Sequence, residues 1–254
     1  MSADWIIQAQ GIVTRFGSNT IHDGLSLQIA RGELVSLIGG SGSGKSLLLR
    51  ELIGLHRPNG GKVTVLGTDV WNCDPEELTA LRRRIGVLFQ DGALFSTLDV
   101  LGNVSAPILE HTTTPPELVR ALALLRLSLA GLGPEVATKM PSELSGGMRK
   151  RAAMARALSL EPEILFLDEP TAGLDPVAAR AFDRLVRFLC DDLGITVMLV
   201  THDLDTLTTI SGRVLALAGG KVVADGTLRE VMSVDDPWIR SYFAARGDHV
   251  PAGA

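Results

Sequence analysis

The chain has 254 residues, of which 46% are hydrophobic and 21% are charged, and its formal net charge is -5 at pH 7. This length fits one large domain, or one domain with a small insertion, and either buries a sizeable core without disulfides or metals. The acidic balance argues against a nucleic-acid-binding protein, because contacts to phosphates normally require a basic face.

The sequence shows no pattern typical of a membrane span or of export. The stretch richest in apolar residues, 118–132, is interrupted by Arg120 and Arg126, and no apolar run reaches the ~18 residues that a span needs. The first residues lack a basic segment followed by an apolar one, so we expect no secretory signal. Cys73 and Cys190 lie far apart in the chain, which favours reduced thiols. We therefore expect a cytoplasmic protein.

Two kinds of predicted strand indicate an α/β fold. Residues 5–13, 25–29 and 62–66 alternate between apolar and polar positions, which predicts a partly exposed antiparallel sheet. Nearly unbroken apolar runs predict strands buried on both faces of a central, mostly parallel sheet, over residues 35–38, 85–88, 164–167 and 196–200. Helix-like stretches between these runs fit crossover connections. We expect one domain over residues 1–246.

A glycine-rich loop follows the first buried strand and opens a predicted helix over residues 47–53. It fits the pattern G-x-x-x-x-G-K-[ST], in which backbone N–H groups wrap phosphate oxygens, and it consists of Gly39, Gly40, Ser41, Gly42, Ser43, Gly44, Lys45 and Ser46. The positive end of the helix would face the anion. Lys45 is expected to reach the β- and γ-phosphates and Ser46 to bind Mg²⁺. A simple flexible turn is the less favoured interpretation.

Residues from about 94 to 160 have a helical pattern and indicate an inserted helical subdomain. Thr114, Pro115, Pro116 and Glu117 read as a capping box with proline in the first turn, so we expect a helix to begin there. Another helix is predicted between residues 227 and 246, and residues 247–254 are expected to be a frayed tail.

Asp168 and Glu169 end the predicted strand 164–167, at the carboxyl edge where open parallel sheets bind ligands. Alone, such a pair is more often part of a solvated loop. Together with a phosphate-binding loop, it predicts that Asp168 holds Mg²⁺, directly or through water. Glu169 is then the candidate base that accepts a proton from the attacking water.

His202 and Gln90 follow two other predicted strands and therefore emerge at the same edge. His202 is a candidate for contacting the γ-phosphate and positioning water, although an isolated histidine there more often has a structural role. Gln90 can contact Mg²⁺ or water without carrying charge.

The segment Leu144-Ser145-Gly146-Gly147-Met148 completes the set of motifs. Ser145 can cap the following helix, while Gly146 and Gly147 leave amide N–H groups open to phosphate. A plain helix cap is the alternative interpretation of this segment alone. In order with the preceding motifs, it resembles the signature sequence of ATP-binding cassette (ABC) proteins.

This resemblance covers the chain from Ile6 to about Phe243 and implies a P-loop NTPase core of the RecA-like type. In the family, two chains bind two ATP molecules between them, so Ser145, Gly146 and Gly147 would act on the ATP of a second copy. Phe16 matches the aromatic residue that stacks on adenine, although the family usually has tyrosine there. Gln90 matches the Q-loop, and the D-loop segment Ala172-Gly173-Leu174-Asp175 would place Asp175 at the dimer seam.

Residues 88–95, 110–112 and 140–149 are similar to those of the ATPases of Mla-type phospholipid transporters. This resemblance implies an integral-membrane permease as partner, an Mce-domain lipid-binding protein and, in some members, a small STAS-domain subunit. It also implies phospholipid movement between the inner and outer membranes, driven from the cytoplasmic face of the inner membrane.

Two other functions stay open at this point. The chain could drive an ABC transporter for another substrate. It could also be a soluble ABC ATPase acting on nucleic acid or ribosomes, although such proteins usually carry tandem cassettes, a long coiled coil or zinc modules, and the sequence shows none of these.

Overall fold

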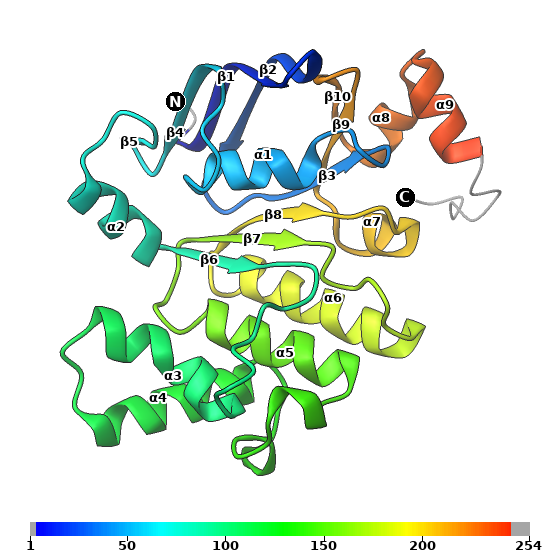
Figure 1. Ribbon diagram of the computed structural model, residues 1–254. Coiled ribbons are helices and arrows are strands. Elements are labelled where there is room, and N and C mark those ends of the chain that lie inside the picture. Colours follow the sequence, from blue (N-terminus) through cyan, green and yellow to red (C-terminus); the bar gives the residue numbers. More distant parts are fainter. Residues whose placement is uncertain (1–3, 245–254) are drawn as a thin grey trace.

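The computed structural model describes residues 4–244 and contains two sheets (Figure 1). The first is antiparallel, in the order β2-β1-β4-β5, and consists of β1 (Trp5–Phe16), β2 (Asn19–Ala30), β4 (Gly60–Val65) and β5 (Thr68–Asp69). The second has the order β10-β9-β3-β8-β7-β6 and consists of β3 (Leu34–Gly39), β6 (Ile85–Leu88), β7 (Ile164–Asp168), β8 (Thr196–Val200), β9 (Arg213–Ala218) and β10 (Lys221–Gly226). All of its strands run parallel except β10. The predicted α/β class is confirmed.

The central strands are buried on both faces, as their apolar runs predict. In β7, Ile164 and Phe166 pack into the core on one side of the sheet, and Leu165 and Leu167 pack into the core on the other side. Because successive side chains of a strand point to opposite faces, a run without polar residues suits only this doubly covered position.

Helices fill the layers on either side of the central sheet. Helix α1 (Lys45–Leu52) lies between the two sheets, and its buried leucines join them into one core. Helix α2 (Pro75–Arg83) packs beside β6. Helices α5 (Gly146–Ala157) and α6 (Pro176–Asp191) cover the opposite face. Helix α1, which follows the phosphate-binding loop, is thus packed between the two sheets.

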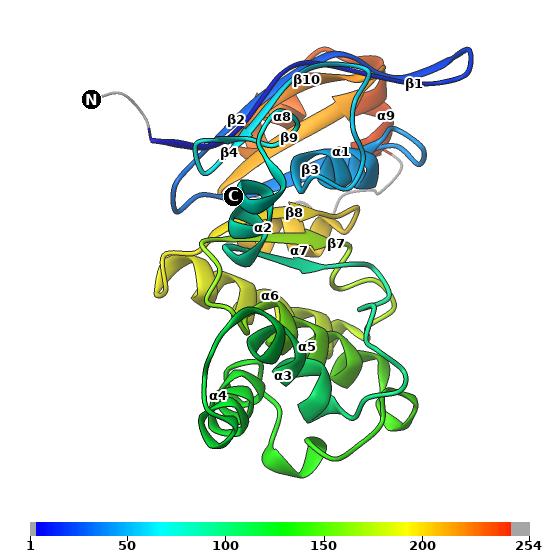
Figure 2. The same cartoon turned by 60° about the vertical axis from the view of Figure 1, so that its left-hand side comes forward.

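The helical subdomain forms a separate lobe below the central sheet in Figure 2. Helices α3 (Val100–His111) and α4 (Pro116–Leu129) pack on α5, with short 3-10 turns at Pro134–Val136 and Pro141–Glu143. Proline does occupy the first turn of α4, but the predicted capping box is wrong. Pro115 is the N-cap residue and no side chain caps the helix, because the Thr114 hydroxyl lies 2.8 Å from that of Thr112, at the end of α3.

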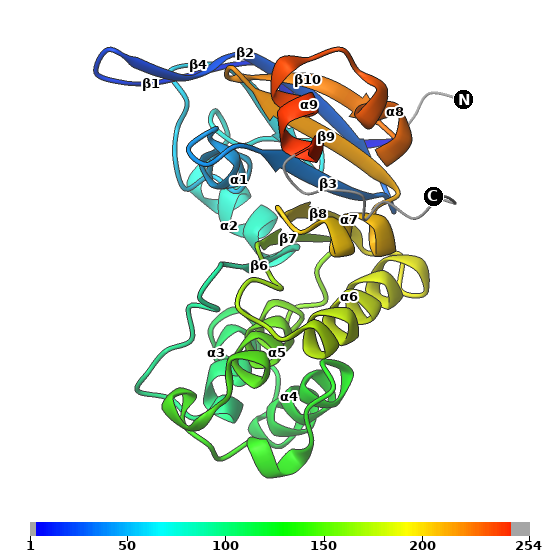
Figure 3. The same ribbon diagram turned by 90° about the vertical axis from the view of Figure 1, so that its right-hand side faces the viewer.

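The C-terminal part packs against β9 and β10 (Figure 3). It contains α7 (Leu204–Ile210), α8 (Leu228–Ser233) and α9 (Pro237–Ala244). The segment 227–246, predicted to contain one helix, contains α8 and α9, because Asp236 accepts hydrogen bonds from the backbone of Trp238 and Ile239 and starts a new helix. Residues 245–246 and the predicted frayed tail, 247–254, lie outside the described residues. Within residues 4–244, no helix is long and apolar enough to cross a membrane.

Candidate functional site

The phosphate-binding loop connects the end of β3 to the start of α1, as the sequence predicts. The backbone requires glycine at positions 39 and 44 of this loop. A Cβ atom on Gly39 would lie 2.5 Å from Ser43 Oγ and 2.8 Å from the carbonyl oxygen of Leu217. Gly44, the N-cap residue of α1, has φ of 97° and provides no side-chain cap, a conformation that favours glycine. The first N–H groups of α1 are therefore left for another acceptor.

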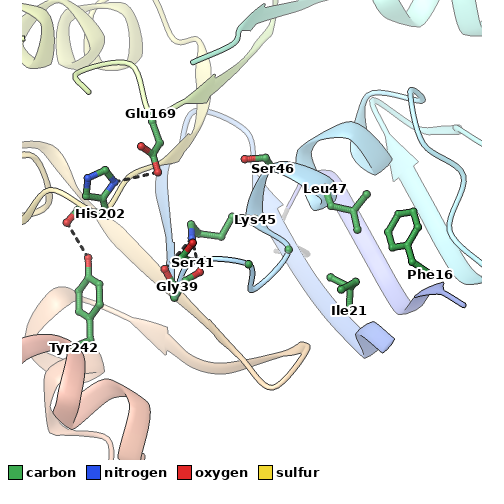
Figure 4. A pocket seen from close by; sticks show the side chains of 13 residues that line it. Phe16, Ile21, Gly39, Ser41, Lys45, Ser46, Leu47, Glu169, His202 and Tyr242 are labelled. Atoms are coloured by element: carbon green, nitrogen blue, oxygen red, sulfur yellow. Dashed lines mark hydrogen bonds and ion pairs between the residues drawn. The ribbon is translucent and has the colours of Figure 1, made fainter. Parts of the chain in front are cut away.

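Lys45 is the first residue of α1, and its ammonium group folds back over the loop (Figure 4). Its Nζ donates hydrogen bonds to the carbonyl oxygens of Gly39, at 2.8 Å, and Gly40, at 2.9 Å. Burial lowers the pKa of Lys45, whereas the nearby carboxylates Glu169 and Asp168 act in the opposite direction. The loop therefore holds a positive charge beside N–H donors, which suits a polyphosphate.

Ser46 and Asp168 meet where α1 faces the end of β7. The Ser46 hydroxyl donates a hydrogen bond of 3.0 Å to Asp168 Oδ1. Asp168 is buried, and desolvation raises its pKa, although the bond from Ser46 lowers it. A hydroxyl and a carboxylate are the hard oxygen ligands that Mg²⁺ prefers.

Glu169 and His202, which follow β7 and β8, form a pair. His202 Nδ1 lies 3.0 Å from Glu169 Oε1 (Figure 4). The Glu169 backbone has φ of 48°, an uncommon conformation for a residue with a side chain, and such strain gathers at functional sites. The pair lies at the predicted edge of the sheet and can align a water molecule for attack on a phosphate.

Lys150 holds the backbone of Glu169, and the sequence did not point to it. Its Nζ donates a 2.8 Å hydrogen bond to the main-chain oxygen of Glu169. Lys150 is buried, and desolvation lowers its pKa. In the sequence it is one of four basic residues of α5, so no local signal separates it from the other three.

A cavity of about 770 Å³ extends from the loop along β1 and β2. Phe16 lines one end with half of its side chain exposed, and its ring centroid lies 5.3 Å from that of His56. Ile21 lies beside it, and Tyr242 of α9 lines the other end (Figure 4). The Tyr242 hydroxyl donates to the His202 carbonyl oxygen at 3.2 Å. Neither Ile21 nor Tyr242 carries a sequence motif.

The other predicted residues do not line this cavity. Gln90 and Gly146 line another cavity, together with Lys150, Ala172 and Gly173. Ser145 caps α5 by accepting from Met148 N at 3.3 Å. Asp175 likewise caps α6. Within the described chain, the 145–147 segment contributes no lining residue to the phosphate-loop cavity.

A phosphate-binding loop that opens a helix, with acidic and histidine side chains at the ends of adjacent parallel strands, defines a P-loop nucleotide hydrolase. A comparison with known protein families identifies a narrower group within this class. A family model described as "ABC transporter" matches residues 22–172. The chain belongs to the ABC transporter family, as one of its ATP-binding and ATP-hydrolysing domains.

Similar proteins cover nearly the whole chain. The "Probable ribonucleotide transport ATP-binding protein mkl" of Mycobacterium leprae is 38% identical over 240 residues, which are 94% of this chain and 69% of that protein. The "Intermembrane phospholipid transport system ATP-binding protein MlaF" of Haemophilus influenzae is 35% identical over 243 residues, 96% of this chain and 92% of that protein. A solved structure, the "Dimeric structure of a post-hydrolysis state of the ATP-binding cassette MJ0796 bound to ADP and Pi", has a TM-score of 0.81 and 33% identity and covers 88% of this chain and 99% of that one.

Proposed function

We propose that this chain is the ATPase subunit of a transporter that moves phospholipid between the inner and outer membranes and maintains outer-membrane lipid asymmetry. The similarity to MlaF over 96% of the chain carries this proposal. The segments 88–95, 110–112 and 140–149, which resemble Mla-type ATPases, support it. The mkl protein, at a similar identity, has a name that gives ribonucleotide as its cargo, so a nucleotide substrate is the second candidate.

The proposed chemistry uses residues on both sides of the phosphate loop. Lys45 and the N–H groups of the loop bind the β- and γ-phosphates, and Phe16 stacks on the adenine. Glu169 accepts the proton of the attacking water, and His202, 3.0 Å away, orients that water against the γ-phosphate. Ser46, Asp168 and Gln90 would hold Mg²⁺, which neutralises charge on the phosphates when bound.

A second copy of the chain completes the proposed site. The N–H groups at the start of α5, at Gly146 and Gly147, lie apart from the phosphate loop of their own chain. A helix N-terminus capped by Ser145 suits an anion, so we assign these groups to the ATP held by the partner copy, with Asp175 at the seam. The similarity to a cassette structure described as dimeric and bound to ADP and Pi supports this arrangement.

The helical subdomain is the proposed contact to an integral-membrane permease. Large apolar side chains are exposed there, among them Phe95, Leu98, Leu109, Leu118 and Leu125, and such surfaces often mark interaction sites. The chain would then sit on the cytoplasmic face of the inner membrane. An Mce-domain lipid-binding protein, and in some complexes a STAS-domain subunit, would complete the assembly.

The experiment that tests the cargo is purification of the complex in detergent from native membranes. We expect a permease and phospholipid to co-purify with the chain, and ATP to drive phospholipid movement when the complex is reconstituted in vesicles. Deletion of the protein from a Gram-negative host should make the outer membrane permeable to detergent. Co-purification of ribonucleotide, with an unchanged barrier, would contradict the lipid proposal and favour the second candidate.

A further inference from the structure

A polar cluster lies buried beneath the phosphate loop, and the proposed chemistry does not use it. It consists of Thr14 on β1, His22 on β2 and Glu51 on α1, each with no exposed surface. The Thr14 hydroxyl donates to Glu51 Oε1 at 2.5 Å. His22 Nδ1 lies 3.0 Å from Glu51 Oε2. Neither of these two atoms has a well-aligned hydrogen bond, so the contact is a close approach of a carboxylate and an imidazole, which is an ion pair when the histidine is protonated.

The cluster has an apolar surrounding. The neighbouring parts of β1, β2 and α1 contribute Ile12, Leu25, Leu48 and Leu52 to the core between the two sheets. Taking a charged pair out of water carries a desolvation penalty, and a buried pair is often no more stable than apolar side chains of the same volume. Packing alone is therefore a poor explanation for a histidine and a glutamate at this place.

His22 connects the cluster to the loop. Its Nε2 lies 3.3 Å from the carbonyl oxygen of Gly44, and because a carbonyl only accepts, Nε2 is the donor. The fit is close, since a Cβ atom on Gly44 would lie 2.4 Å from His22 Nε2. The same carbonyl accepts the first helical hydrogen bond of α1, from Leu48 N at 2.8 Å.

The Gly44 carbonyl fixes the direction of the next N–H group. In a trans peptide the C=O and N–H bonds point in opposite directions. A carbonyl held toward His22, in the interior, therefore aims the N–H of Lys45 away from the core, toward the cavity that the loop lines. The same contact fixes where the Lys45 side chain leaves the backbone.

We propose that Thr14, His22 and Glu51 are positioning residues for ATP binding. Thr14 orients the Glu51 carboxylate, Glu51 holds the His22 ring through Nδ1, and His22 Nε2 sets the Gly44–Lys45 peptide. Through these contacts the antiparallel sheet positions the phosphate loop, and it also forms the adenine end of the cavity. This inference rests on the phosphate site proposed above.

Two single variants distinguish the contributions of the two ring nitrogens of His22. The amide nitrogen of asparagine takes the place of Nδ1, whereas that of glutamine takes the place of Nε2. We expect His22→Asn to weaken ATP affinity about tenfold, because it removes the donor to the Gly44 carbonyl oxygen, and His22→Gln to bind within about threefold of the parent, because it keeps that donor. Equal affinities for the two variants would overturn the proposal.

An apolar triple variant separates positioning from stability. Thr14→Val is included because the buried Thr14 hydroxyl would lose its acceptor when Glu51 is replaced. We expect Thr14→Val with His22→Leu and Glu51→Leu to melt near the parental temperature, yet to bind ATP about tenfold more weakly. Parental ATP affinity in this variant would overturn the proposal. If the triple variant does not fold, the comparison of His22→Asn with His22→Gln decides alone.

Lys45→Ala is the control for the site itself and should lose ATP affinity in the same assay. Parental affinity in Lys45→Ala would contradict the phosphate site. Loss of affinity there, with parental affinity in every His22 variant, would leave the phosphate site in place and overturn only the positioning role.

Discussion

Lys150 Nζ donates a 2.8 Å hydrogen bond to the main-chain oxygen of Glu169, and this contact joins the start of α5 to the end of β7. Gly146, four residues earlier on α5, belongs to the segment proposed to touch the ATP of the second copy. Residues four apart lie on the same side of a helix. A shift of α5 on docking would therefore reach the backbone of the proposed base through Lys150.

Lys150→Met should lower the rate of ATP hydrolysis more than it lowers ATP affinity. The methionine fills the same buried space, but Glu169, with φ of 48°, loses the donor that holds its carbonyl. Hydrogen bonds to charged groups contribute about 1.5–3 kcal/mol, so we expect kcat to fall about ten- to a hundredfold. Lys62→Met, which changes an exposed lysine, is the matched control. Equal losses of kcat and affinity would argue against a role confined to Glu169.

Phe95→Asp or Leu98→Asp should weaken the association with the permease. Both side chains are exposed in the loop that follows Gln90, and a carboxylate there would have to lose water on docking. The isolated chain should keep its basal ATP hydrolysis. Leu193→Asp, on an exposed leucine after α6, is the control. Co-purification of the permease with the Phe95 and Leu98 variants at the level of the Leu193 variant would exclude this surface.

Asp183→Asn should stabilise the protein at neutral pH. Asp183 is buried on α6, where desolvation raises its pKa from 3.8 to about 6, against a hydrogen bond from Thr206. Between about pH 4 and 6 the unfolded chain releases this proton while the folded chain keeps it, so stability falls as pH rises through this window and the loss persists above it.

Asparagine removes the charge and keeps an acceptor for the Thr206 hydroxyl. We expect a gain on the order of 1 kcal/mol at pH 7, seen as a rise in Tm of about 2–4 °C. The difference from the parent should vanish near pH 4. Asp192→Asn, on the surface at the end of the same helix, should change Tm little at either pH. If Asp183→Asn were no more stable than the parent at pH 7, ionisation of the buried Asp183 would not destabilise the folded protein, and the prediction would be wrong.

Local sequence patterns predict the strands and the loop because burial and backbone conformation at each of their positions select the residue found there. The unbroken run 164–167 fits a doubly buried strand, and the loop at residues 39–46 needs glycine where the backbone has positive φ or no room. The carboxyl edge of a parallel sheet then brings Asp168, Glu169 and His202 toward the loop, so that part of the site follows from topology.

The remaining contacts depend on tertiary packing, which no short pattern encodes. Thr14 and Glu51 are 37 residues apart, and Tyr242 and His202 are 40 apart. At Thr114 a local pattern predicts a contact that the fold does not form. Its neighbours fit a capping box, but the helix begins at Pro116 and the hydroxyl faces Thr112.

In the proposed site each ATP lies between two chains, and Glu169 is the base. Glu169→Gln should bind ATP and not cleave it, since an amide does not accept the proton of water. The variant should therefore accumulate as an ATP-loaded dimer.

Size-exclusion chromatography with light scattering measures the mass of the complex, and the nucleotide that elutes in the same peak gives the amount of ATP bound per chain. With Mg²⁺ and ATP, Glu169→Gln should elute at twice the chain mass of 27.0 kDa, with one ATP per chain. It should return to the single-chain mass with ADP. A variant that binds ATP yet stays at the single-chain mass would contradict the two-chain site, and one that hydrolyses ATP at the parental rate would contradict the role of Glu169 as the base.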